Sequence, residues 1–147
     1  MNIIFLDYNG VLDTNDNMDV INLDNLQRLK HIVDETNSKV ILTTSKKNSF
    51  YITGFLNKRL QEDIKLMESN GIQVIGITPK ANTREEEIEL YLNNHLEVEA
   101  FCIIDDDYDM ERFADNLVKL PNQIEDGQMG LDDYHMNLAI KILKKRI

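Results

Sequence analysis

The stretch "NIIFLDYNGVL", residues 2–12, joins a nearly continuous apolar run to a polar turn. Such a run is typical of a strand that is covered on both faces of a parallel sheet. Asp7 follows the run directly, and Gly10 lies in the turn before the chain returns to apolar residues. A strand that ends in an acid and a glycine indicates either a catalytic loop or a plain turn. Asn9 occupies the position, two residues after Asp7, where a catalytic loop would carry a second acid.

Further apolar runs alternate with segments of helical period along the chain. The predicted strands cover 2–6, 39–43, 72–77 and 100–104, with a weaker fifth at 116–120. The predicted helices fall within 23–33, 48–70, 83–92 and 132–145. Gly71 is predicted as a helix C-terminal cap, and Thr83 with Glu86 as a capping box. This alternation predicts one α/β domain over 1–147, with an open parallel five-stranded sheet between two layers of helices.

The composition is that of a soluble globular protein with an acidic balance. A net charge of −10 disfavours general binding to nucleic acid and to anionic membranes, although a local basic site stays open. Cys102 is the single cysteine, so an intrachain disulfide is excluded and a reducing compartment fits. The chain shows no signal-peptide pattern and no apolar run near the roughly 20 residues of a membrane span. We therefore expect a cytoplasmic protein without a membrane partner.

Polar residues follow the predicted strands, and the sheet would bring them together. In open parallel sheets, ligands bind beyond the carboxyl ends of the strands. The residues at these ends are Asp7 to Gly10, Thr43 to Ser45, Thr78 to Lys80 and Asp105 to Asp107, and Arg84 opens the helix after the third strand.

The chemistry of this set favours metal-assisted phosphoryl transfer. Two acidic clusters at one edge would repel each other unless a cation lay between them, and hard oxygen ligands suit Mg²⁺. Hydroxyls and the N–H groups of a turn suit a phosphate, and a guanidinium or ammonium group would pair with its oxygens. An aspartate in such a site can attack phosphorus and form an aspartyl-phosphate.

Four motifs in order resemble those of the haloacid dehalogenase (HAD) superfamily. They are "DYNGVL" (7–12), "VILTTS" (40–45), "REEEIELYL" (84–92) and "CIIDDD" (102–107). More narrowly, the pattern R-x-x-EI-x-x-YL, then "IIDDDYDM" (103–110) and "GL" (130–131), resembles the small HAD domain named after Swiss Army Knife RNA repair proteins. The resemblance implies a Rossmann-like fold and a phosphatase that depends on Mg²⁺.

The resemblance implies a nucleophile and a metal site in the first and fourth motifs. Asp7 would be the nucleophile and a Mg²⁺ ligand. Asn9 would give its backbone carbonyl to the metal, and the side chain at this position is normally the general acid and base. Asp105 and Asp106 would complete the metal site.

The resemblance places phosphate binding in the second and third motifs and in the turn after Asp7. Thr43 and Thr44 would bind the phosphate, together with the turn at Tyr8. Arg84 would be the basic residue of the third motif, with Lys80 as its alternative. Taken alone, Arg84 would also fit the solvated first turn of a helix.

Asn9 departs from the superfamily pattern, because an amide cannot donate a proton to a leaving oxygen or take one from water. General acid–base help is typically worth about 10²–10⁴-fold, so turnover should be slow while metal and phosphate binding persist. The alternative is a non-catalytic domain of the same fold that binds phosphate or a partner. A third hypothesis is a response-regulator-like phosphoacceptor domain. In that class the residue that accepts the phosphoryl group usually lies at the end of the third strand, where this chain has Thr78.

The segments between the motifs leave little room for a cap domain. Residues 13–38 hold little more than a loop and one helix, and 46–71 hold no separate sheet. We expect a capless or minimally capped site, open to a phosphorylated macromolecule; the net charge weighs against nucleic acid.

Two other features are interpreted as structural. Residues 13–24 carry acids and amides near the spacing of a calcium-binding EF-hand loop, but the glycine and the bidentate glutamate of such a loop are missing. We predict a solvated loop there. Cys102 lies within an apolar run and is predicted to be a core residue.

Overall fold

The computed structural model describes residues 1–17, 20–44, 57–106, 109–121 and 129–145. The elements are β1 (Asn2–Leu6), α1 (Leu23–Thr36), β2 (Ser38–Leu42), α3 (Lys58–Ser69), β3 (Val74–Ile77), α4 (Arg84–Asn93), β4 (Ala100–Asp105), the 3₁₀ helix η2 (Glu111–Asn116), β5 (Leu117–Lys119) and α5 (Asp133–Lys144). Strands and helices alternate through most of the chain, as predicted. None of the helices in the described residues is long and apolar enough to cross a membrane.

The described strands form one five-stranded sheet in the order β3-β2-β1-β4-β5, and every pair is parallel. β1 lies at the centre, where Leu6 pairs with Leu42 of β2 on one side and with Ile104 of β4 on the other. All five residues of β1 are buried, because the strand has neighbours on both edges and helices on both faces.

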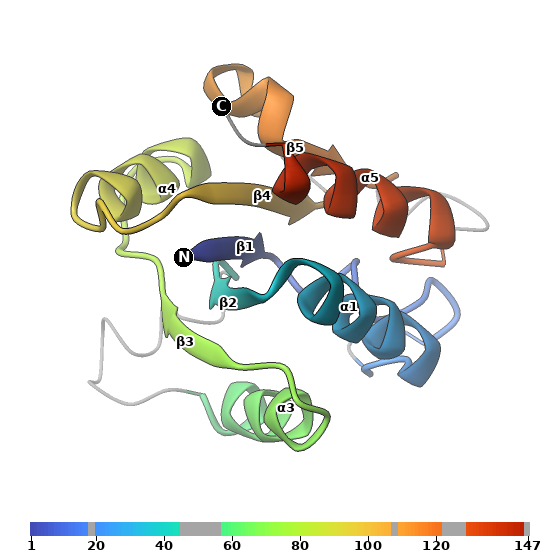
Figure 1. The fold of residues 1–147 in the computed structure, drawn as a ribbon. Helices are drawn as coiled ribbons and strands as arrows, with labels where there is room; N and C mark the ends of the chain where they lie inside the picture. Colours follow the sequence, from blue (N-terminus) through green and yellow to red (C-terminus); the bar gives the residue numbers. More distant parts are fainter. Residues whose placement is uncertain (18–19, 45–56, 107–108, 122–128, 146–147) are drawn as a thin grey trace.

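Helices cover both faces of the sheet and form the outer two of three layers (Figure 1). Ile4 and Leu6 belong to a core that includes α1, α3 and α5, whereas Ile3 and Phe5 face a second core built on α4. Successive side chains of a strand point to opposite faces, so β1 serves both cores. The predicted three-layer α/β/α architecture with an open parallel sheet is confirmed.

The predicted helix caps at Thr83 and Gly71 are present. The side chain of Thr83 accepts a hydrogen bond from the backbone N–H of Glu86 at 3.1 Å, which satisfies one of the free donors at the start of α4. Gly71 follows α3 with φ of +79° and donates its N–H to the carbonyl of Glu68.

Several predicted boundaries differ from the observed ones by one residue, and the starts of α3 and β3 differ by more. α3 begins at Lys58 after an Asn57 cap, and the predicted helix from residue 48 falls partly within 45–56, outside the described residues. β3 covers only Val74–Ile77, and Ile75 is exposed, because this strand lies at the edge of the sheet and pairs with β2 alone. The apolar run 72–77 predicts a strand that is buried throughout, and such burial would need neighbouring strands on both sides of β3.

The connections between the first three strands carry little additional structure in the described residues. Between β1 and β2 lie a loop and α1, and between β2 and β3 the described part holds α3. No separate sheet covers the site in this described part, as expected for a minimally capped domain.

The loop before α1 corrects one prediction. Asp13 and Thr14 are 2% and 4% exposed, so the beginning of this loop is buried and not solvated. Asp13 is held inside because its Oδ1 accepts a hydrogen bond from the backbone N–H of Gly10 at 2.5 Å. Asp16 and Asn17 are exposed, as predicted.

Candidate functional site

The candidate site lies where the strand order changes direction, between β1 and β4. The chain proceeds from β1 to β2 and β3 on one side of the sheet, and β4 then pairs with the other side of β1. The backbone N–H of Asp7 donates to the carbonyl of Ile104 at 3.1 Å, which extends this pairing beyond the strand. Asp7 therefore stands beside Asp105, at the switch point where open α/β sheets bind ligands.

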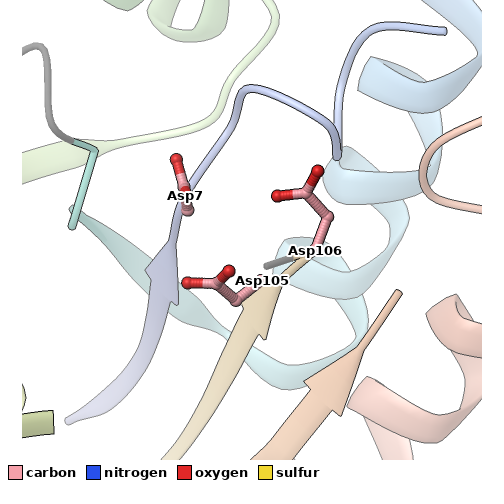
Figure 2. Close-up of side chains that lie close together, drawn as sticks. All are labelled: Asp7, Asp105 and Asp106. Carbon is pink, nitrogen blue, oxygen red and sulfur yellow. The ribbon is translucent and has the colours of Figure 1, made fainter. Parts of the chain in front are cut away.

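Asp7, Asp105 and Asp106 form the acidic cluster (Figure 2). Each side chain offers a carboxylate oxygen, and these three oxygens lie within 4.8 Å of one another. Asp105 is completely buried, while Asp7 and Asp106 are 9% and 8% exposed. Figure 2 shows the three carboxylates around one space at the ends of β1 and β4. Among the residues that the structure describes, this is the one group of three or more such side chains close enough together to hold a metal ion.

The donor set of the acidic cluster fits Mg²⁺. Mg²⁺ takes oxygen ligands at about 2.1 Å, so opposite ligands in its octahedron lie about 4.2 Å apart. The three carboxylate oxygens lie within 4.8 Å of one another, so they are gathered closely enough to surround one such ion. Buried carboxylates repel each other strongly, and a divalent cation would remove that repulsion.

Gly10 makes room for this cluster. Its φ of +80° lies in the left-handed region that favours glycine. A Cβ atom at this position would overlap the carboxylate of Asp106. The glycine of the first motif is therefore required twice, by the backbone conformation of the turn and by the close approach of Asp106.

The hydroxyl-bearing residues continue the hydrogen-bond ladder at the same edge of the sheet. The N–H of Thr43 donates to the carbonyl of Leu6 at 3.0 Å, so Thr43 lies beside Asp7. The N–H of Thr78 donates to the carbonyl of Leu42 at the same distance. Thr43, Thr44 and Thr78 are all fully buried, and Ser45 lies outside the described residues.

Arg84 is the cation that the structure brings to the cluster. Its side chain is 7% exposed, and its Nη1 lies 3.8 Å from Oδ2 of Asp7 and 4.0 Å from Oδ2 of Asp105. The position results from the start of α4, whose first residue is Arg84. Lys80, the alternative basic residue, is exposed.

Tyr8 and Asn9 differ in their surroundings. The phenol of Tyr8 is buried in the core on the side of α1, α3 and α5. Burial and the nearby Asp63 carboxylate raise the pKa of Tyr8 above its usual value, so the phenol stays protonated. Asn9 is partly exposed in the turn.

A set of hydrogen bonds holds the loop after β1 in place. The side-chain amide of Asn25 donates to the carbonyls of Met129 at 2.9 Å and Asp13 at 3.4 Å. The N–H of Leu131 donates to the carbonyl of Val11 at 2.7 Å. Gly130 has φ of +76°, and a Cβ there would come within 2.5 Å of the Val11 carbonyl. Gly130 and Leu131, the "GL" pair, thus contact the loop that follows Asp7, although they lie near the other end of the sequence.

Sequence reasoning missed three residues around the site. Asn25 belongs to the support just described, and Asp13 was assigned to a solvated loop. Glu87 is buried and pairs with Arg84 within the first turn of α4. The spacing of three residues between Arg84 and Glu87 was the available signal, because such pairs meet on a helix.

Cys102 and the histidines stand apart from the cluster. Cys102 is fully buried in the core, and burial raises the pKa of its thiol, as expected of a structural cysteine. His31 is exposed, while His95 stacks on Tyr91 with ring centroids 3.8 Å apart. His135 contacts Asp132 at the start of α5.

A comparison with protein families places these observations in context. The family described as the HAD domain in Swiss Army Knife RNA repair proteins matches residues 3–135, which include the acidic cluster and Arg84. No curated protein and no solved structure is significantly similar to the chain. The matched region contains the parallel sheet and the residues at its carboxyl edge, as the four motifs predicted. The chain therefore belongs to the family of HAD domains in Swiss Army Knife RNA repair proteins.

Proposed function

We propose that this domain is a Mg²⁺-dependent phosphatase in which Asp7 is the nucleophile. One observation carries the proposal: the Asp7 carboxylate belongs to a cluster of three whose oxygens lie within 4.8 Å, with the guanidinium of Arg84 3.8 Å away. This combination supplies a nucleophile, a cation site and a positive partner for phosphate oxygens. Membership of a HAD family supports a hydrolase of this type.

The residues of the site divide into two groups in this proposal. Asp7, Asp105 and Asp106, with the backbone carbonyl of Asn9, would hold the metal. A Mg²⁺ ion held there would neutralise charge on the phosphoryl oxygens.

The second group binds the phosphate. Thr43, Thr44 and Arg84 would contact its oxygens, and Tyr8 would contribute its backbone, because its phenol is buried in the core. Arg84 is preferred to Lys80, because Arg84 is the one that pairs with Asp7.

The reaction has two steps. A carboxylate oxygen of Asp7 forms a bond to phosphorus, the bond from phosphorus to the leaving oxygen breaks, and that oxygen takes a proton from water. The oxygen of a water molecule then forms a bond to the same phosphorus, the bond from phosphorus to the Asp7 oxygen breaks, and the water releases a proton to solvent. Inorganic phosphate leaves, and the Asp7 carboxylate is restored.

Asn9 limits both steps in this proposal. Its amide neither protonates the leaving oxygen nor accepts a proton from the attacking water. The rate should therefore depend on how well the leaving group departs unaided, and the aspartyl-phosphate should persist longer than with an acid at this position.

The proposed substrate is a phosphorylated molecule, with a macromolecule favoured by the absence of a cap sheet in the described residues. The family's description as domains of RNA repair proteins brings a phosphorylated nucleic-acid end into consideration. The net charge of −10 weighs against broad nucleic-acid affinity, so such a substrate would be held mainly at its phosphate. We propose a single domain over 1–147 that acts in the cytoplasm.

Asn9 also favours a second candidate function, a non-catalytic domain that binds phosphate or a partner protein. In that case Mg²⁺ and phosphate would bind without any hydrolysis.

The two candidates are separated by hydrolysis of an aryl phosphate in the presence of Mg²⁺. The parent chain, Asn9→Asp and Asp7→Asn would be compared, with calorimetry of Mg²⁺ and inorganic phosphate binding alongside. Faster hydrolysis by Asn9→Asp, by about 10²–10⁴-fold, and none by Asp7→Asn would support the phosphatase. Binding without hydrolysis in both the parent and Asn9→Asp would support the second candidate. The phosphatase proposal fails if neither chain hydrolyses the substrate and Mg²⁺ does not bind.

A further inference from the structure

Glu87 is a buried carboxylate on the first turn of α4, directly beside the candidate site. It is 7% exposed, and its Oε1 lies 3.4 Å from Nε of Arg84. Its other oxygen, Oε2, accepts a hydrogen bond from the backbone N–H of Ala81 at 3.3 Å. Glu87 therefore connects Arg84 with the segment that follows β3.

The burial of Glu87 is not explained by the helix alone. Acids at the start of a helix are favourable because of the helix dipole, and Glu85 meets this need while remaining partly exposed. Glu85 pairs with Arg112 at 3.3 Å on the surface. A buried carboxylate, by contrast, costs several kcal/mol of desolvation that only close partners offset. The partner of Glu87 at 3.4 Å is the guanidinium of the site.

Arg84, which pairs with Glu87, also lies near two carboxylates of the acidic cluster. Its Nη1 lies 3.8 Å from Asp7 and 4.0 Å from Asp105, which is within ion-pair range. A direct hydrogen bond from a guanidinium to a carboxylate would be about 2.7–2.9 Å long. Arg84 is thus within ion-pair range of both carboxylates, but these distances are longer than those of direct hydrogen bonds.

We infer that Glu87 is a positioning residue that holds Arg84 back from Asp7 and Asp105. These two carboxylates are among the three that would hold Mg²⁺, and Asp7 must also keep an oxygen for attack. A guanidinium bonded directly to them would compete with the metal and with phosphorus. The inference rests on the proposed function and assigns to Glu87 the placement of its phosphate-binding cation.

The charge and the reach of Glu87 can be tested separately. Glu87→Gln keeps the shape of the side chain and removes its charge, whereas Glu87→Asp keeps the charge and shortens the reach to Arg84. Glu85→Gln is the matched control, because it removes the same charge from the same turn away from the cluster. Mg²⁺ and inorganic phosphate binding would be measured by calorimetry, and folding by thermal melts.

Both Glu87 variants should bind Mg²⁺ about 10-fold more weakly than the parent, as expected for the partner of a residue beside a metal site. Glu85→Gln should bind like the parent. Parent-like binding by Glu87→Asp would overturn the inference, because charge alone would then suffice. Lower melting temperatures with unchanged Mg²⁺ binding in both Glu87 variants would also overturn it, since the role would be structural only.

A second readout does not depend on the metal or on turnover. The Nε–H of Arg84 should give an NMR signal protected from solvent exchange in the parent and in Glu85→Gln, and not in either Glu87 variant. If the parent failed to bind Mg²⁺, the proposed function would fall, while this signal would still decide the role of Glu87. An equally protected Arg84 signal in Glu87→Asp would reject that role.

Discussion

The carboxylate of Asp106 occupies the space that a side chain at position 10 would need, since a Cβ on Gly10 would overlap it. Gly10→Ala should therefore displace Asp106 and weaken Mg²⁺ binding by about 10–100-fold. The φ of +80° adds a conformational cost of about 1–3 kcal/mol. Calorimetry and thermal melts would measure the two effects.

Gly76→Ala is the matched control, because a Cβ there meets Cδ1 of Ile41 at an ordinary 3.7 Å. It should leave Mg²⁺ binding unchanged. Undiminished Mg²⁺ affinity in Gly10→Ala would contradict the close approach of Asp106.

The amide at Asn9 should make the rate of hydrolysis depend strongly on the leaving group. Without a proton donor at position 9, the rate of aspartyl-phosphate formation should fall steeply as the pKa of the leaving phenol rises across a series of aryl phosphates. Asn9→Asp should flatten this dependence, because an acid can protonate the leaving oxygen. The measurement is kcat/KM for each substrate with both chains. Equal slopes would show that position 9 does not supply the proton in either chain.

Asn25 tests the support of the loop after β1. Asn25→Asp keeps an acceptor for Arg28, whose Nη1 donates to Oδ1 of Asn25 at 2.9 Å, but it removes the donor to Met129 and Asp13. We expect a loss of about 1–3 kcal/mol in the free energy of unfolding, because the buried carbonyl of Asp13 and the partly buried one of Met129 lose their donor. Urea unfolding measures this loss. Gln27→Glu, the same change at an exposed position of α1, should have little effect; similar losses in both variants would contradict the role of Asn25.

Asp132 links stability to pH. Partial burial raises its pKa, but hydrogen bonds from the backbone N–H and ring of His135 outweigh this effect, so the pKa lies below its usual value. A lowered pKa in the folded state stabilises the fold above the usual pKa of about 3.8, and this contribution is lost as pH falls through the folded value. The contribution should therefore be complete at neutral pH and disappear in acid.

Asp132 also caps α5, so Asp132→Ala should cost about 1 kcal/mol at pH 7. Asp132→Asn keeps a capping oxygen and should lose only the part that depends on pH. Unfolding midpoints from pH 2 to pH 7 would measure both variants. A difference between the parent and Asp132→Asn that persists unchanged at pH 2 would reject the ionised cap.

The strands and helices were predictable because their signals are local. Four apolar residues of β1 in a row indicate a strand between two layers of helices, and Thr83 marks the start of α4 by its own hydrogen bond. The boundaries of β3 were less predictable. Residues 72 and 73 are as compatible with a strand as the ones that follow, and the sheet edge decides where pairing with β2 begins.

The acidic cluster was also predictable, because parallel strands bring their carboxyl ends to one edge. Asp7 and Asp105 each follow a buried run, and the pairing of Leu6 with Ile104 sets them side by side. The choice of Arg84 over Lys80 as the cation near Asp7 required the structure. Both residues lie close to the end of β3 in the sequence, but only the first turn of α4 points a guanidinium at the cluster.

The α/β class, the parallel strands and the set of acids and hydroxyls at their ends follow from the sequence alone, because periodicity and strand termini are properties of neighbouring residues. Which distant groups lie in contact depends on the tertiary structure. Asp106 against Gly10, Asn25 with Met129 and Arg84 beside Asp7 are contacts between residues far apart in the chain. Their geometry depends on how the helices pack on the sheet, and that packing is a property of the whole chain.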